Sequence, residues 1–290
     1  MRYYSYFPGC SAKGTAVGYE ISIQAIKSSL EMDLAELDDW NCCGTTPYAS
    51  TDELGAICIA ARNLALAEKT GLDLVTACSA CYVTLARANS FIKLYPDIKE
   101  KVNQALSEVG LEYKGTVKVR HLLEVIINDI TLESVSSKVI NPLDGLRVAP
   151  YYGCQLVRPD LGFDDPENPQ TLDRLITSLG AEATPFQNKN RCCGSSLVIA
   201  EPKVAFRLIR DVLASAQEGN AQCIITACPL CQTNLDAYQG MVNSEFKTKF
   251  DLPVLFFTQL IGLALGIDAK TLGIDTAIVS PKKVMAAITK

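Results

Sequence analysis

Two short stretches, Asn41-Cys42-Cys43-Gly44 and Arg191-Cys192-Cys193-Gly194, decide how this chain folds. Their cysteine pairs are 150 residues apart. In both halves a single cysteine precedes the pair, and 34 residues separate the pair from a C-x-x-C motif; these cysteines are Cys10, Cys78 and Cys81, and Cys154, Cys228 and Cys231. The residues before the C-x-x-C motifs also repeat, as Val-Thr-Ala at 75–77 and Ile-Thr-Ala at 225–227. The chain is therefore an internal duplication.

Strand-like and helix-like segments alternate around these cysteines. The predicted strands are residues 2–8, 34–40, 72–77 and 117–119, then 146–152, 182–186, 222–227 and 253–257. The predicted helices are 17–31, 52–70, 81–94 and one beginning near 121, then 169–179, 197–217, 230–238 and 258–265. This alternation predicts an α/β protein of two duplicated Rossmann-like domains with parallel sheets, related by pseudo-twofold symmetry. We expect the domains to be 1–143 and 144–290, the second including a tail from 267.

The cysteines follow predicted strands, where a strand gives way to a loop or a helix. In an open parallel sheet these carboxyl ends lie along one edge, where ligands bind. Five thiols from each half should therefore converge, with helix N-termini to offset thiolate charge. Gly44 and Gly194 let the backbone approach a cofactor without a Cβ in the way. Cys58 and Cys223 have no counterpart in the other half and are expected to be core residues.

Composition excludes several classes of protein. Twelve cysteines in 290 residues are too few for a disulfide-stapled secreted scaffold, and no signal peptide is visible. A net charge of −5 argues against nucleic-acid binding. The longest apolar run, 254–266, is too short to span a bilayer, so we expect a cytoplasmic protein without a membrane span. Its 48% hydrophobic residues suggest that partner subunits cover part of the surface.

The metal is a separate question. Zinc needs four ligands, and so does an ordinary cubane cluster, whereas each half offers five thiolates. Five favour a larger or more open iron–sulfur cluster. Zinc in one half stays open as an alternative.

The doubled pattern C-x31-CC-x34-C-x-x-C and C-x37-CC-x34-C-x-x-C, with glycine after each pair, resembles the cysteine-rich CCG-domain family. The opening Tyr6-Phe7-Pro8-Gly9-Cys10, together with Trp40 before Asn41, is similar to heterodisulfide reductase B subunits, which act in methanogenesis. The resemblance implies two non-cubane [4Fe-4S] clusters flanking a substrate disulfide. Their ligands would be Cys10, Cys42, Cys43, Cys78 and Cys81, and Cys154, Cys192, Cys193, Cys228 and Cys231.

That resemblance also implies an activity: two-electron reductive cleavage of a disulfide, such as the coenzyme M–coenzyme B heterodisulfide, with each cluster supplying one electron. The residues carrying it would be Cys10, Cys42, Cys43, Cys154, Cys192 and Cys193. No ferredoxin motif or nucleotide loop is present in the sequence, so electrons must come from partners: a ferredoxin-like C-type subunit and a flavin-containing A-type subunit. Alternatives are a thiol-oxidising or sulfur-carrier disulfide subunit, a non-catalytic electron-transfer or anchor subunit, and a zinc-stabilised interaction module.

An anionic disulfide would need cations close to the clusters. Lys13, Arg158, Lys189 and Arg191 are near cluster cysteines in sequence, although each is more often a solvated surface charge. His121 is a candidate proton donor, with a helix N-terminal position as the alternative. Tyr151 and Tyr152 either offer a hydroxyl near the second cluster or pack at the strand end.

Overall fold

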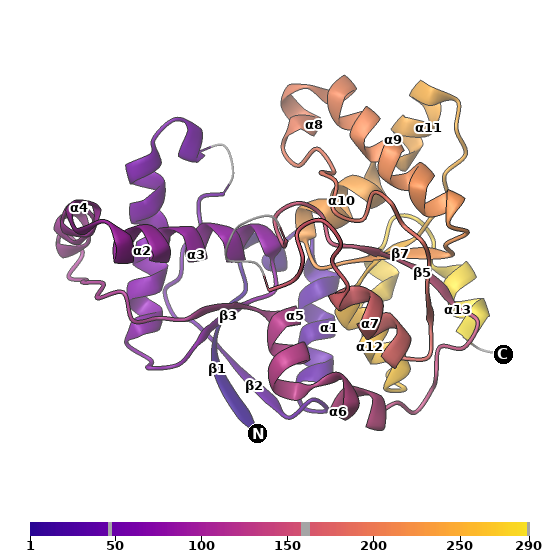
Figure 1. Ribbon diagram of the computed structural model, residues 1–290, viewed down its shortest axis with the longest axis horizontal. Helices are drawn as coiled ribbons and strands as arrows, with labels where there is room; N and C mark the ends of the chain where they lie inside the picture. Colours follow the sequence, from indigo (N-terminus) through magenta and orange to yellow (C-terminus); the bar gives the residue numbers. More distant parts are fainter. Residues whose placement is uncertain (46–47, 158–162, 289–290) are drawn as a thin grey trace. The chain divides into compact units, whose positions relative to one another are not determined.

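The computed structural model describes residues 1–45, 48–157 and 163–288, so Arg158 lies outside the described residues (Figure 1). The chain forms two compact units. The first contains residues 1–10 and 31–125, and the second contains residues 11–30 and 126–290. The domain boundary predicted at residue 143 stays a prediction.

In the first unit, four parallel strands are ordered β2-β1-β3-β4. The strands are β1 (Arg2–Phe7), β2 (Met32–Glu36), β3 (Leu74–Thr76) and β4 (Val119–His121). The helices of this unit are α2 (Glu53–Glu68), α3 (Ser79–Leu94), α4 (Pro96–Ser107) and α5 (Leu122–Val125). β3 is buried along its whole length, as expected for a central parallel strand covered on both faces.

The second unit repeats this sheet, with the order β6-β5-β7-β8 and every pair parallel. Its strands are β5 (Arg147–Tyr151), β6 (Glu182–Ala183), β7 (Cys223–Thr226) and β8 (Val254–Phe256). Its helices include α1 (Val17–Lys27), α6 (Leu132–Ser137), α7 (Thr171–Ser178), α8 (Leu197–Ala200), α9 (Pro202–Glu218), α10 (Pro229–Ala237), α11 (Gln239–Phe246), α12 (Phe257–Ala264) and α13 (Lys282–Ile288). The predicted fold class, two α/β halves with parallel sheets, is confirmed.

Several element boundaries differ from the sequence-based expectation. The second strand is Met32–Glu36 rather than 34–40. The helix expected over 197–217 is divided into α8 and α9 at Pro202, which has no N–H to continue a helix and instead occupies the first turn of α9. Helices α4, α11 and α13 are additional. The buried face of α4 is narrow, since it consists of Val102 and Leu106 alone.

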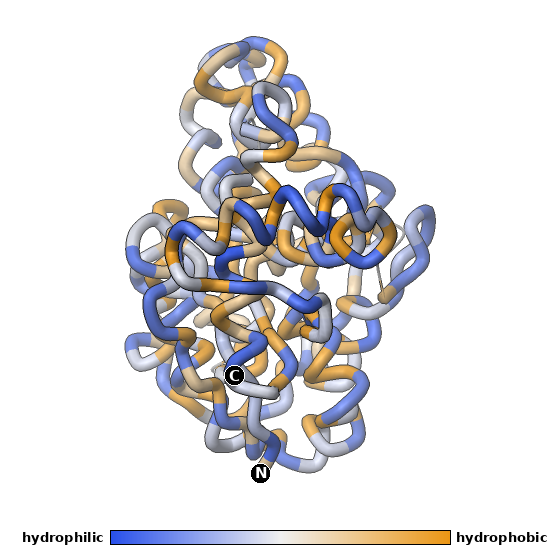
Figure 2. The backbone as a smooth tube through the Cα atoms, turned by 90° about the vertical axis from the view of Figure 1, so that its left-hand side faces the viewer, coloured by the Kyte–Doolittle hydropathy of each residue, from blue (hydrophilic) through white to orange (hydrophobic). Residues whose placement is uncertain are grey.

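Hydrophobic residues recur between hydrophilic ones along the helices (Figure 2), which agrees with helices that bury one face. Among the residues the structure describes, none of the helices combines the length and apolarity needed to cross a membrane.

Helix α1 packs within the second unit against α12 and the 3-10 turn Ile274–Thr276. The Ser22 and Thr258 hydroxyls share a buried hydrogen bond of 2.6 Å, and the Tyr19 ring stacks on Phe256 at 4.0 Å between centroids. Gly18 makes the approach possible, because a Cβ there would lie 2.8 Å from the Gly273 carbonyl oxygen and closer still to the Thr276 hydroxyl.

We therefore expect Gly18→Ala to destabilise the protein, because the added methyl group meets backbone. The cost is about 1–3 kcal/mol, the usual range for overpacking, measured as the free energy of unfolding in urea. Gly240→Ala in α11 is the matched control, since a Cβ there meets nothing within 4 Å and alanine favours a helix. Equal stability of the two variants would contradict the close packing of α1.

Glu68, at the end of α2, holds the segment that leads into β4. Its carboxylate accepts hydrogen bonds from the Lys114 N–H at 2.8 Å, the Thr116 N–H at 2.8 Å and the Thr116 hydroxyl at 2.6 Å. Partial burial acts to raise the pKa of Glu68, but these hydrogen bonds outweigh it and the pKa is lowered.

A lowered folded-state pKa means that the Glu68 carboxylate stabilises the fold above its unfolded pKa, and that this contribution disappears as pH falls through the folded value. Glu68→Gln should lower the free energy of unfolding by about 1 kcal/mol at pH 7, a figure reduced for solvent exposure. Urea titrations should show the difference shrinking toward zero in acid. Glu108→Gln, at an exposed position, serves as the control; a difference that is constant with pH would refute the assignment.

Candidate metal centres

Five cysteines of the first unit gather at the carboxyl edge of its sheet. Cys10 follows β1, the Cys42-Cys43 pair follows β2, and Cys78 caps the N-terminus of α3 directly after β3. The Cys42 and Cys10 Sγ atoms are 3.7 Å apart, and the Cys43 and Cys81 Sγ atoms are 3.4 Å apart. The Cys81 thiol also interacts with that of Cys78. The structure thus brings the whole predicted quintet together.

Another five gather in the second unit in the same way. The Cys193 and Cys231 Sγ atoms are 3.4 Å apart, which equals the separation at their counterparts. The Cys154 thiol hydrogen-bonds with Cys192, and the Cys231 thiol with Cys228, which caps α10. Cys58 lies within α2, and Cys223 is buried in β7 at the start of the strand.

The thiols in each quintet share protons unequally. In the first unit, the hydrogen bonds that Cys43 makes with Cys42 and with Cys81 lower the pKa of Cys43 to about 3. The hydrogen bond with Cys43, followed by burial, raises the pKa of Cys42. In the second unit the hydrogen bond with Cys192 dominates, and the pKa of Cys193 is raised to about 12. Metal binding must displace such protons, because thiolates rather than thiols are ligands. The N-terminus of α3 in the first unit, and that of α10 in the second, each carry a positive dipole end beside the cysteines of the same unit, which favours thiolates.

The sulfur atoms are arranged as contacting pairs. Within the described ranges, no group of three or more His, Cys, Asp or Glu side chains is placed to hold one metal ion. A multi-iron cluster takes its thiolates on different irons, so its ligands need not surround a single point. What fits such a cluster is the chemistry of the donor set, because thiolate sulfur is the ligand that iron–sulfur clusters use.

Glycines allow close approach to these sulfurs, but not the glycines that the sequence suggested. Gly9 and Gly153 have positive φ, and a Cβ would lie 3.0 Å from Cys81 Sγ and 3.1 Å from Cys231 Sγ, respectively. The missing Cβ of Gly44 instead faces Ile59 on α2, and that of Gly194 faces Ala205 on α9. A cofactor-binding role for Gly44 and Gly194 stays a prediction. The repeat of glycine before Cys10 and Cys154 was the available signal.

Thr84 and Asn234 are further site residues that the sequence reasoning missed. Each lies three residues after the last cysteine of its quintet, on the same helix face. Thr84 hydrogen-bonds with Cys43 and helps to lower its pKa. Asn234, 4% exposed, donates to the Cys193 and Ser195 carbonyl oxygens at 3.0 Å each, and so fixes the turn around Gly194.

Asn234→Ala should therefore loosen the second quintet. The buried Cys193 carbonyl and the partly buried Ser195 carbonyl lose their donor, so we expect the free energy of unfolding to fall by about 1–3 kcal/mol. Gln217→Ala, at an exposed position on α9, is the control. Unfolding curves that coincide for wild type and Asn234→Ala would show that the amide does not hold the turn.

The expected substrate cations differ in their surroundings. Lys189 is tied up inside the second unit, where its Nζ donates to the Pro169 carbonyl oxygen at 2.5 Å and to Asp173 Oδ1 at 3.4 Å. Lys13 ends the 3-10 turn Cys10–Lys13 and is exposed. Arg191 is also exposed.

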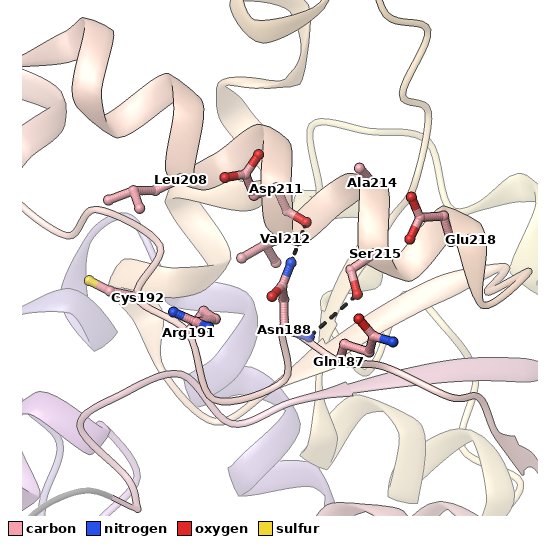
Figure 3. A pocket seen from close by; sticks show the side chains of 10 residues that line it. All are labelled: Gln187, Asn188, Arg191, Cys192, Leu208, Asp211, Val212, Ala214, Ser215 and Glu218. Atoms are coloured by element: carbon pink, nitrogen blue, oxygen red, sulfur yellow. Dashed lines mark hydrogen bonds between the residues drawn. The ribbon is translucent and has the colours of Figure 1, made fainter. Parts of the chain in front are cut away.

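Arg191 and Cys192 line a pocket of about 420 Å³ between the loop that carries them and α9 (Figure 3). The pocket contains both signs of charge, since Asp211 and Glu218 lie on its α9 wall. The Asp211 carboxylate pairs with Arg210 at 2.6 Å. The pocket is polar and offers Arg191 to an anionic group beside Cys192.

His121 is fully buried at the end of β4 and marks the start of α5. Its Nδ1 accepts the Leu123 N–H at 3.1 Å, and its Nε2 lies 3.5 Å from the Ser79 hydroxyl. These contacts match the helix N-terminal position that was the alternative to a proton donor. Ser79 follows Cys78 directly, so the ring also supports the start of α3.

Tyr151 and Tyr152 are buried and hydrogen-bonded. The Tyr151 hydroxyl donates to the Arg191 carbonyl oxygen at 2.6 Å, and the Tyr152 hydroxyl donates to Asp173 Oδ2 at 2.5 Å. Burial raises the pKa of Tyr151 well above its ordinary value, and the neighbouring cysteine thiolates, Cys231 foremost, raise it further.

The chain is similar to known proteins along most of its length. The family model described as "Cysteine-rich domain" (CCG) matches residues 4–86 and 148–236. The chain is 38% identical to the 8-methylmenaquinol:fumarate reductase membrane anchor subunit of Wolinella succinogenes, covering 97% of this chain and 98% of that protein. It is 35% identical to the B-type subunit of the ferredoxin/F420H2-dependent CoB-CoM heterodisulfide reductase of Methanosarcina acetivorans, over 93% and 92%.

The identity is 36% with a protein of Archaeoglobus profundus that is like the B-type subunit of heterodisulfide reductase, over 91% of each chain. A crystal structure of a hypothetical protein from Helicobacter pylori superposes with a TM-score of 0.77 and 15% identity; the match covers 96% of this chain and 52% of that one, and it shows the fold alone. The two family-model matches and the relatives at 35–38% identity together establish that this chain belongs to the CCG cysteine-rich domain family.

Proposed function

We propose that this chain is an iron–sulfur subunit of a multisubunit oxidoreductase, in which each cysteine quintet holds one non-cubane [4Fe-4S] cluster. The observation that carries the proposal is the sulfur contact made in both units between cysteines from different strand ends, 3.4 Å at Cys43–Cys81 and at Cys193–Cys231. The heterodisulfide reductase subunits among its relatives support the same assignment.

When bound, the clusters supply one-electron carriers. The chain's own residues prepare the sites for them. Helices α3 and α10 direct their positive ends at the thiolates, and Thr84 and Asn234 hold the CCG turns against those helices. Three thiols of each quintet are buried, which keeps water from these ligands; they are Cys43, Cys78 and Cys81, and Cys193, Cys228 and Cys231. Cys10 and Cys42 are exposed.

Within this role we infer a catalytic function, reductive cleavage of a disulfide as in heterodisulfide reductase B subunits. Each unit keeps a complete quintet, whereas an electron relay needs only one cluster. The exposed Cys10 and Cys42 give a substrate access to the first site, and Arg191 offers a cation beside Cys192 in the second. The proposed partners are a ferredoxin-like C-type subunit and a flavin-containing A-type subunit. Operation in reverse, as thiol oxidation, uses the same residues.

A second candidate rests on a specific comparison. The 38% identity to a fumarate reductase membrane anchor subunit extends over nearly the whole of both chains. In that role the chain would pass electrons between a membrane-linked donor and partner subunits without cleaving a disulfide.

Disulfide reduction by the anaerobically purified native complex, with reduced viologen as electron donor and the CoM–CoB heterodisulfide as substrate, separates the two functions. Cys42→Ser/Cys43→Ser should abolish it, because these thiolates cannot be replaced by hydroxyls at a soft metal site. Cys58→Ser, outside both quintets, should retain it. Quinol-dependent fumarate reduction without disulfide cleavage would select the second candidate and overturn the first.

A further inference from the structure

The loops that carry Cys154 and Cys192 are tied together by hydrogen bonds just before each cysteine. The Tyr152 and Gly153 N–H groups both donate to the Lys189 carbonyl oxygen, at 2.8 and 3.1 Å. The Tyr151 hydroxyl donates to the Arg191 carbonyl oxygen at 2.6 Å. Three hydrogen bonds therefore fix the spacing of two loops that are far apart in the sequence.

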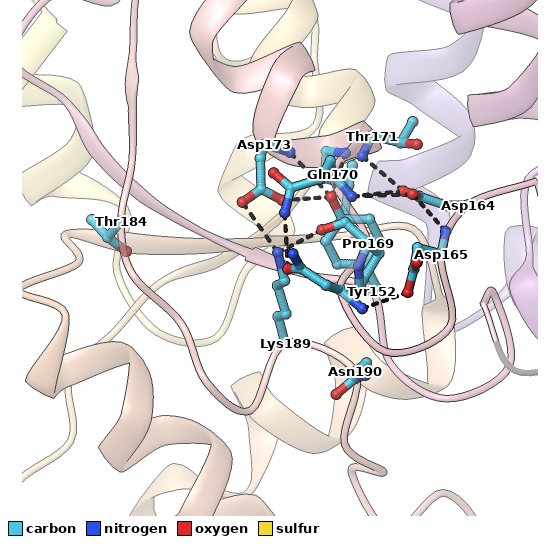
Figure 4. A network of polar contacts seen from close by, with 12 residues as sticks. Tyr152, Asp164, Asp165, Pro169, Gln170, Thr171, Asp173, Thr184, Lys189 and Asn190 are labelled. Atoms are coloured by element: carbon cyan, nitrogen blue, oxygen red, sulfur yellow. Dashed lines mark hydrogen bonds and ion pairs between the residues drawn. The ribbon is translucent and has the colours of Figure 1, made fainter.

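Side-chain hydrogen bonds of Tyr152, Asp173 and Lys189 further connect these two loops to the start of α7 (Figure 4). The Tyr152 hydroxyl accepts the N–H groups of Leu172 and Asp173 at 2.7 and 3.2 Å, at the N-terminus of α7, while it donates to the Asp173 carboxylate. Lys189 binds that carboxylate and the Pro169 carbonyl oxygen, and its Nζ lies 5.7 Å from the centroid of the Tyr152 ring. We call Tyr152, Asp173 and Lys189 the brace.

The brace is largely shielded from water. The Lys189 and Asp173 side chains are 12% and 22% exposed, and Tyr152 is 1% exposed. Removing one partner of such a pair is costly, because the other charge is then left poorly solvated.

The first unit cannot form this brace. The duplication aligns Tyr151, Tyr152 and Lys189 with Phe7, Pro8 and Asp39. Phenylalanine has no hydroxyl, and proline has neither a hydroxyl nor an N–H. There the Phe7 ring instead meets Trp40 edge-on, with 5.4 Å between centroids.

Exposure of the cysteines follows the same difference between the two units. Cys10 and Cys42 are exposed, whereas Cys154 and Cys192 are only partly so. The duplicated sites thus have matching sulfur pairs but different support around them.

We propose that Lys189, Asp173 and Tyr152 are positioning residues that pre-organise Cys154 and Cys192 before a cofactor binds, through a brace that the first site does not have. The proposal rests on the proposed function only in calling these cysteines cofactor ligands. Lys189 is then a structural cation rather than the substrate-binding one that its position in the sequence suggested.

Hydrogen–deuterium exchange of the full-length, cluster-free protein tests this directly. The amides of Tyr152, Gly153, Leu172 and Asp173 should be protected in the wild type. Lys189→Met keeps the alkyl stem but removes the ammonium group, and Tyr152→Phe removes the hydroxyl. Each should raise exchange at these amides about tenfold or more, as expected for losing a charged or doubly used hydrogen bond.

Three comparisons make the result specific. Lys189→Arg should restore most of the protection, and Lys283→Met, which breaks the exposed pair with Asp251, should leave it unchanged. Exchange in the first unit, at residues 6–10, should be the same in all variants. Wild-type-like protection of the four amides in both Lys189→Met and Tyr152→Phe would overturn the proposal. If one variant fails to fold, the other, judged against Lys189→Arg, decides.

Iron release to a chelator from the loaded protein provides the second measurement. Lys189→Met should lose iron faster than wild type, because its second site has lost the brace. An iron-release rate that is the same in both proteins would count against pre-organisation. A protein that binds no iron but shows the predicted exchange pattern would refute the proposed function and leave the brace standing.

Discussion

Each site depends on one constraint, the shared direction of parallel strands. Because β1, β2 and β3 all end at the same edge of their sheet, three loops from distant parts of the sequence deliver cysteines to one place, and β5, β6 and β7 do the same in the second unit. Sulfur atoms from different loops then come within 3.4 Å. Without parallel pairing the cysteines would have no reason to meet.

Thiolates that lie close together repel one another, because they carry like charges. Two features of the fold reduce this repulsion. Helix N-termini after β3 and β7 supply partial positive charge, and thiol–thiol hydrogen bonds distribute the remaining protons. An iron-containing cofactor, as proposed, would relieve the repulsion further because its iron is positively charged. The grouping of five thiols at one sheet edge therefore supports the proposed cluster more strongly than it supports a set of core residues.

Sequence alone predicted much of this, because duplication and strand–helix alternation depend on local patterns. The cysteine sets and sheet class followed from spacing, and the relatives support the family. Other features depend on tertiary contacts that no local pattern encodes. The environment of Lys189 is one: a lysine near a cysteine motif suggests a surface cation, and only folding shows Asp173 and the Pro169 carbonyl around it. The packing of α1 beside α12 through Gly18 is another.

Iron and acid-labile sulfide counts on the anaerobically purified full-length protein, with one quintet disabled at a time, test the central claim most directly. Two independent sites predict about eight iron atoms per chain in the wild type, and about half that number in both Cys42→Ser/Cys43→Ser and Cys192→Ser/Cys193→Ser. Zinc in place of iron, or an unchanged iron content in either double variant, would contradict the account.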